Sequence, residues 1–159
     1  MKYVINDYPE RYFAGIEYPN GVELNQQVEI QKIWVEFLEI SKEKIAQKKN
    51  PLKFIGLECY PPDFMDIKVF DYYALVETDG LIEGNEEIIT KRLPKGRYIC
   101  FEISFDDLQN EIKRVYKYLQ EQKIRVHKSF DIEDYLISEN YGEKGAKLNF
   151  SFLLDEDVK

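Results

Sequence analysis

Leu57-Glu58-Cys59-Tyr60 and Ile132-Glu133-Asp134-Tyr135 are two copies of one pattern: an apolar residue, a glutamate, a variable residue and a tyrosine. Each copy lies in the first strand-like run after a helix-like run. Side chains two positions apart on a strand point to the same face, so the glutamate and the tyrosine of each copy share a face. The recurrence predicts a chain made of two similar halves.

The helix-like run before each copy has one apolar face. Residues 30–45 and 108–119 carry apolar side chains at helical spacing with charged residues opposite, and Asp106 or Asp107 can cap the second run. These faces are expected to pack against sheets, burying Ile33, Trp34, Phe37, Ile112, Val115 and Leu119.

Strand-like runs complete each half. They cover residues 12–18, 54–60 and 67–77 in the first half, and 88–93, 97–104, 130–137 and 148–154 in the second. The order strand, helix, strand, strand thus occurs twice. We therefore predict an α+β fold: a duplicated βαββ unit, antiparallel sheets with two helices on one face, and a cleft between pseudo-symmetric halves. One domain is expected over residues 1–159, with halves at about 1–80 and 86–156.

Composition narrows the classes of function. The formal charge is −8, which disfavours binding to phosphate backbones and predicts no direct DNA binding. No stretch approaches a membrane span, and the two cysteines are far apart, so we expect a cytoplasmic protein with reduced thiols. The single histidine, His127, has no neighbouring ligand residues, so neither a metal site nor a cofactor is expected. Twelve tyrosines and ten phenylalanines suit a pocket for a small molecule.

The chain resembles the GyrI-like family, the effector-binding domains fused to many bacterial regulators of the AraC and MerR types. The resemblance rests on the duplicated order, on Phe13-Ala14-Gly15-Ile16, on Gly56-Leu57-Glu58-Cys59-Tyr60, on Lys95-Gly96-Arg97-Tyr98 and on Phe130-Asp131-Ile132-Glu133-Asp134-Tyr135. It implies a ligand cleft between the halves in which Glu133 lies among tyrosines. No helix-turn-helix pattern is found, which again favours ligand binding over direct DNA contact.

Glu133 is the principal candidate site residue. A carboxylate held among aromatic rings can pair with a cation whose charge the ring faces also attract. An ordinary solvent-facing glutamate is the alternative interpretation. The ligand-binding residues expected with Glu133 are Tyr135, Tyr60, Glu58, Tyr72, Phe101, Phe152 and Trp34, although Trp34 also suits the core.

Three functions remain open from the sequence. The favoured one is a stand-alone sensor or sequestering module for a hydrophobic small molecule, cationic or neutral, linked to transcription regulation or drug response. The second is a hydrolase that opens strained electrophilic molecules, with Glu133 activating water and Tyr135 donating a hydrogen bond. The third is a protein-binding inhibitor of the gyrase-inhibitory type.

Overall fold

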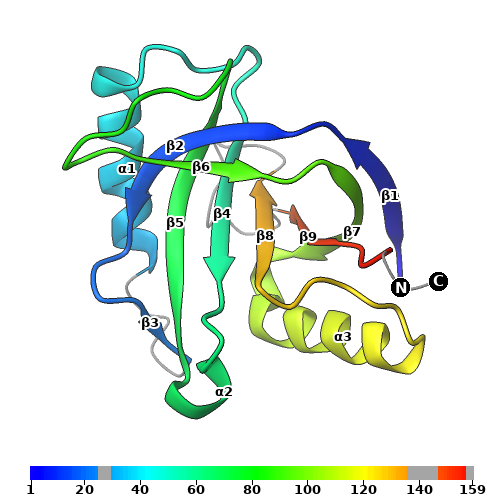
Figure 1. The fold of residues 1–159 in the computed structure, drawn as a ribbon. Helices are drawn as coiled ribbons and strands as arrows, with labels where there is room; N and C mark the ends of the chain where they lie inside the picture. Colours follow the sequence, from blue (N-terminus) through cyan, green and yellow to red (C-terminus); the bar gives the residue numbers. More distant parts are fainter. Residues whose placement is uncertain (25–29, 136–146, 157–159) are drawn as a thin grey trace.

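The computed structural model describes residues 1–24, 30–135 and 147–156 of the chain (Figure 1). The strands in the first half are β1 (Tyr3–Tyr8), β2 (Arg11–Glu17), β3 (Val22–Glu23), β4 (Phe54–Cys59) and β5 (Val69–Thr78). Those in the second half are β6 (Ile89–Leu93), β7 (Gly96–Ser104), β8 (Phe130–Tyr135) and β9 (Lys147–Leu153). The helices are α1 (Ile30–Lys44), α2 (Phe64–Ile67) and α3 (Leu108–Glu121), the last preceded by a 3-10 turn at Phe105–Asp107.

The strands form one antiparallel sheet in the order β1-β7-β9-β8-β4-β5-β2-β6, with the short β3 beside β5. This order is symmetric about the β4–β8 pair: β2, α1, β4 and β5 correspond to β7, α3, β8 and β9. The duplicated βαββ unit is therefore confirmed. The two copies of the repeated pattern meet at the seam, where Glu58 is opposite Asp131 and Gly56 is opposite Glu133.

Two features differ from the sequence prediction, and part of it falls outside the described residues. The halves share one continuous sheet, because β4 and β8 pair directly. β1 was not predicted, because it is largely exposed and depends on pairing with β7 of the other half. In the same way, β6 of the second half pairs with β2 of the first half. The last two positions of the predicted strand 130–137, and the turn that follows, lie outside the described residues.

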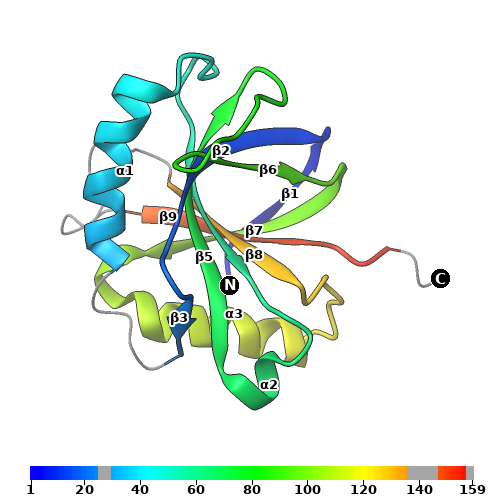
Figure 2. The same ribbon diagram turned by 60° about the vertical axis from the view of Figure 1, so that its left-hand side comes forward.

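Both long helices pack on the same face of the sheet. Figures 1 and 2 show α1 beside the first half and α3 beside the second, while β1, β2 and β6 curve over the other side. The core on the helix face includes Ile33, Trp34 and Phe37 of α1 together with Val115 and Leu119 of α3, as predicted. Ile112 differs from the prediction, because it packs at the margin of this cluster and is only half-buried.

A second apolar cluster occupies the opposite face. It includes Ile55 and Leu57 of β4, Leu75 of β5 and Ile132 of β8, the strand positions that alternate with those of the helix face. Cys59 and Cys100 are free thiols, as predicted. No helix in the described part of the chain has both the length and the apolar character needed to cross a bilayer.

Candidate functional site

Glu133 lies on the helix face of the central strand β8, almost completely shielded from solvent at 6% exposure. Its Oε1 accepts hydrogen bonds from the hydroxyls of Tyr72 and Tyr135, each at 3.0 Å. The Trp34 indole N–H donates to the Tyr72 hydroxyl oxygen at 2.9 Å, and the Trp34 ring lies 5.0 Å from the ring of Tyr135, centroid to centroid. Trp34 is therefore both a core residue of α1 and part of the surroundings of the carboxylate.

Two more carboxylates share this face. Asp131 lies two residues before Glu133 on β8, and Glu58 lies opposite Asp131 on β4. Both are buried, with 1% and 9% exposure. The Tyr60 hydroxyl donates to Asp131 Oδ2 at 2.7 Å and is 3.3 Å from Glu58 Oε2, while the Tyr116 hydroxyl also donates to Asp131 Oδ2. Three carboxylates and four tyrosines thus form one cluster, which we name the acid–tyrosine cluster: Glu58, Asp131, Glu133, Tyr60, Tyr72, Tyr116 and Tyr135.

The acid–tyrosine cluster has no cation of its own among the described residues. No described lysine, arginine or histidine forms an ion pair with Glu58, Asp131 or Glu133. Burying a charge without a partner is costly, so these groups hold their protons more tightly than they would in water.

Desolvation is the main cause of this change in proton affinity. It raises the pKa of Glu133 to about 7 and that of Asp131 to about 6, although the tyrosine hydroxyls lower both. The pKa of Glu58 is raised well above its usual range, first by desolvation and then by the charges of Asp131 and Glu133. Hydrogen bonding between Glu58 and Asp131 raises the pKa of Glu58 and lowers that of Asp131, so the two acids can share one proton.

Because Gly56 has no side chain, it leaves room for the hydrogen bond between the Tyr72 hydroxyl and Glu133. It is opposite Glu133 across the seam, and a methyl group on its Cα would lie 2.4 Å from the Tyr72 hydroxyl oxygen and 2.8 Å from Glu133 Oε1. These distances are far below a van der Waals contact, so any side chain here would disturb the pair.

The structure brings most of the predicted site residues together. Glu133, Tyr135, Tyr72, Trp34, Glu58 and Tyr60 belong to the cluster or contact it directly. Phe152 is one ring further away, 5.4 Å from the ring of Tyr116, and Phe101 lies beyond Phe152 at 6.4 Å. Phe101 is fully buried and packs with Tyr3 and Tyr118, so it supports the core behind the cluster.

Sequence reasoning missed two members. Asp131 could have been found, because a residue two positions before Glu133 must share its face of the strand. Tyr116 lies within the helix-like run 108–119, where sequence reasoning gave it no part in a site. Tyr116 as a whole is 42% exposed, yet its hydroxyl donates to Asp131 across the boundary between helix and sheet. No local sequence pattern reveals such a contact.

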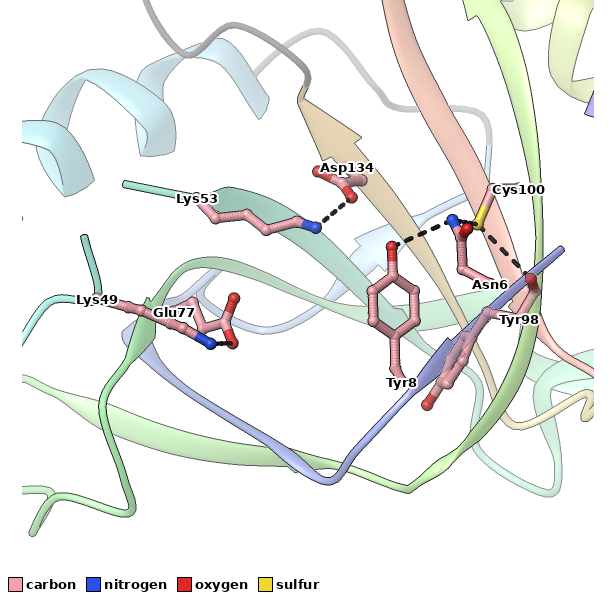
Figure 3. Close-up of polar contacts among 8 residues, drawn as sticks. All are labelled: Asn6, Tyr8, Lys49, Lys53, Glu77, Tyr98, Cys100 and Asp134. Carbon is pink, nitrogen blue, oxygen red and sulfur yellow. Dashed lines mark hydrogen bonds and ion pairs between the residues drawn. The ribbon is translucent and has the colours of Figure 1, made fainter. Parts of the chain in front are cut away.

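A separate polar group lies on the opposite face of the sheet (Figure 3). Here each buried acid has a lysine: Asp134 is 3.1 Å from Lys53 Nζ, and Glu77 is 3.4 Å from Lys49 Nζ. Asp134 follows Glu133 directly on β8 and points to the other side. The two neighbouring carboxylates therefore contrast: Asp134 is paired with a cation, and Glu133 is surrounded by hydroxyls and rings. Within the described residues, no group of three or more His, Cys, Asp or Glu side chains is arranged to hold a metal ion.

Comparison with solved structures supports this fold. The C-terminal domain of EcmrR is 12% identical with a TM-score of 0.69, covering 99% of this chain and 98% of that one. SAV2435 bound to tetraphenylphosphonium is 16% identical with a TM-score of 0.71, covering 99% and 96%. A hydrolase encoded by lin2189 of Listeria innocua is 9% identical with a TM-score of 0.55, covering 97% and 92%. No protein with a curated description matches the chain by sequence.

A family model matches nearly the whole sequence. The model for Cass2, an integron-associated effector binding protein, covers residues 5–151. Together with the fold, this match confirms the resemblance to GyrI-like effector-binding domains that the repeated pattern indicated. The chain belongs to the Cass2 family of integron-associated effector binding proteins.

Proposed function

We propose that the chain binds a hydrophobic organic cation beside Glu133, as a sensor or sequestering domain linked to transcription regulation or drug response. The observation that carries the proposal is a buried carboxylate that has aromatic hydroxyl partners but no ion pair among the described residues. A bound cation would supply the missing charge. The rings of Trp34, Tyr72 and Tyr135 would add cation–π attraction of about 0.5–2 kcal/mol each when desolvated.

Further support comes from the contrast within the sheet and from a related fold. The acids on the opposite face already have lysine partners, whereas Glu133 has none among the described residues, so Glu133 is the acid proposed to accept a foreign cation. SAV2435, which shares the fold, carries tetraphenylphosphonium in its structure. The net charge of −8 attracts cations over long range and repels nucleic acid, so this domain is proposed to act without touching DNA.

The test is a calorimetric titration with tetraphenylphosphonium. Glu133→Gln keeps the shape and removes the charge, so it should weaken binding by about 1–3 kcal/mol, the range for losing a charge-assisted contact. Asp134→Asn is the matched control, because it removes a buried carboxylate from the next position of the same strand on the other face. Triphenylphosphine oxide, a neutral aryl compound, should bind both proteins alike. Equal affinity of tetraphenylphosphonium for the wild type and Glu133→Gln would contradict the proposal.

Hydrolysis of a strained electrophilic molecule is the second candidate function. It is favoured by the pKa of Glu133 near 7, which suits a general base, and by the hydroxyl of Tyr135 at 3.0 Å, which can donate to a developing oxyanion. If Glu133 is a general base, Glu133→Gln should affect turnover and not binding, the reverse of the result expected for a cation site. With styrene oxide as the probe, Glu133→Gln would leave binding nearly intact and reduce diol formation at least about 100-fold.

A further inference from the structure

The far end of the acid–tyrosine cluster, around Glu58 and Asp131, has two carboxylate oxygens without a hydrogen-bond donor. Glu58 Oε1 and Asp131 Oδ1 are both buried, and neither is partnered by any described protein group. Buried polar atoms are almost always partnered in folded proteins, so two on facing residues need an explanation.

Counting the available hydrogens shows why these oxygens are left over. A tyrosine hydroxyl carries a single hydrogen to donate. Tyr60 and Tyr116 both direct theirs to Asp131 Oδ2, and Tyr60 is the phenol within reach of Glu58, at Oε2. Among the described residues, the other oxygen of each acid therefore has no tyrosine donor left. The remaining hydrogen is the proton that Glu58 and Asp131 can share between them, unless a donor from outside replaces it.

We propose that Glu58 and Asp131 form a second cation subsite, which takes a protonated amino or amidino group through its N–H hydrogens. The inference rests on the proposed function and narrows its ligand class to compounds with an N–H cation at this end, including dications whose other charge faces Glu133. A phosphonium or quaternary ammonium ion has no N–H and cannot satisfy these oxygens.

The spacing of the two subsites fits a small dication. Asp131 and Glu133 are two residues apart on one strand, so their backbone positions are separated by about 7 Å. Glu133 lies against Trp34, Tyr72 and Tyr135. Asp131 is itself 1% exposed, but its two hydroxyl partners reach toward solvent, since Tyr116 is 42% exposed and Tyr60 is half-buried. An aromatic diamine with one nitrogen at each acid would have to reach them past these two rings.

Binding at this subsite should displace a proton. Among the described residues, the titratable groups that face Glu58 are Tyr60 just after β4, Asp131 and Glu133 on β8, Tyr72 on β5 and Tyr116 on α3, all of them acids or phenols. Because none of these described groups is a cation, burial favours the protonated form of Glu58 in the absence of a ligand. A bound ammonium ion would donate a hydrogen bond to the acids and bring a positive charge, both in place of this proton. The proton should therefore be released on binding.

The experiment compares p-xylylenediamine, 4-methylbenzylamine and tetraphenylphosphonium by calorimetry at pH 7. The diamine and the monoamine have the same ring and differ by one cationic nitrogen. In the wild type the diamine should bind at least about tenfold more tightly, beyond the about twofold statistical advantage of its two equivalent ends. Titrations in buffers of different ionisation enthalpy should show more proton release with the diamine than with tetraphenylphosphonium.

Substitutions assign the effect to the second subsite. Asp131→Asn should weaken the diamine at least about tenfold and leave tetraphenylphosphonium within about threefold. Glu58→Gln should give the same pattern, so the test survives if one variant fails to fold. A diamine that binds no more tightly than the monoamine, no detectable binding of either amine at millimolar concentration, or equal weakening of the diamine and tetraphenylphosphonium by both variants would overturn the inference. Unchanged tetraphenylphosphonium affinity in Glu133→Gln would instead overturn the proposed function beneath it.

Discussion

The acid–tyrosine cluster should make the protein less stable as the pH rises through neutrality, and Glu133→Gln should remove a measurable part of that loss. The folded protein holds the Glu133 proton up to about pH 7, whereas the unfolded chain releases it near 4.5, the ordinary value. Between these two values the folded state binds more protons than the unfolded state. The free energy of unfolding therefore falls as the pH rises across this window and levels off above it.

The size of the effect follows from the two pKa values of Glu133. They differ by about 2.5, and each unit corresponds to about 1.4 kcal/mol, so the full contribution is about 3–4 kcal/mol. Between pH 5 and pH 8 the wild type should lose about 2–3 kcal/mol through this residue alone. Glu133→Gln has no proton to release here. It also removes a charge that raises the pKa of Glu58, so the variant's remaining dependence on pH is smaller as well.

Urea unfolding at pH 5, 6, 7 and 8, followed by far-UV circular dichroism and by the fluorescence of Trp34, measures this difference. Glu102→Gln is the control. The pKa of Glu102 is lowered by Lys147 and Lys2, so its contribution to stability is lost only below pH 4.5, and its curve should run parallel to that of the wild type. Parallel curves for the wild type and Glu133→Gln from pH 5 to pH 8 would show that Glu133 is not the desolvated acid described here.

Two further substitutions test the packing on which the site depends. Leu119→Ala, at a buried position of α3, should cost about 2–5 kcal/mol of unfolding free energy, whereas Val35→Ala, 66% exposed on α1, should change it by less than about 0.5 kcal/mol. Equal urea midpoints for the two variants would mean that the helix faces are wrongly assigned. Gly56→Ala should force apart the Tyr72 hydroxyl and Glu133 and weaken tetraphenylphosphonium in calorimetry. Unchanged affinity would show that the carboxylate does not need this geometry.

The parts of the site that could be predicted are those that depend on local periodicity. Glu58, Tyr60, Glu133 and Tyr135 were found because alternation along a strand fixes which side chains share a face. Asp131 follows from the same rule, and was missed because the repeated pattern begins one residue after it.

The parts that could not be predicted depend on contacts between distant segments. β1 pairs with a strand of the other half, and nothing in its own residues specifies that partner. Tyr116 reaches Asp131 from α3 at a position that periodicity assigns to the apolar stripe. The partner of the Trp34 indole, Tyr72, lies 38 positions away and is fixed only when α1 packs on the sheet.

The acid–tyrosine cluster has the properties expected of a binding site whose buried charges lower the stability of the unliganded protein. Replacing three buried acids by apolar residues of similar size would remove the desolvation penalty, so their presence in the centre of the sheet opposes folding. A bound cation reverses this penalty, because an opposite charge within a few ångströms favours the ionised carboxylate and lowers its pKa. If the site binds a cation as proposed, the free energy that the unliganded fold loses at the ionised Glu58, Asp131 and Glu133 would be recovered on binding. Neutral molecules of the same shape would not recover it, so the burial that weakens the free protein would also make the proposed site selective for charge.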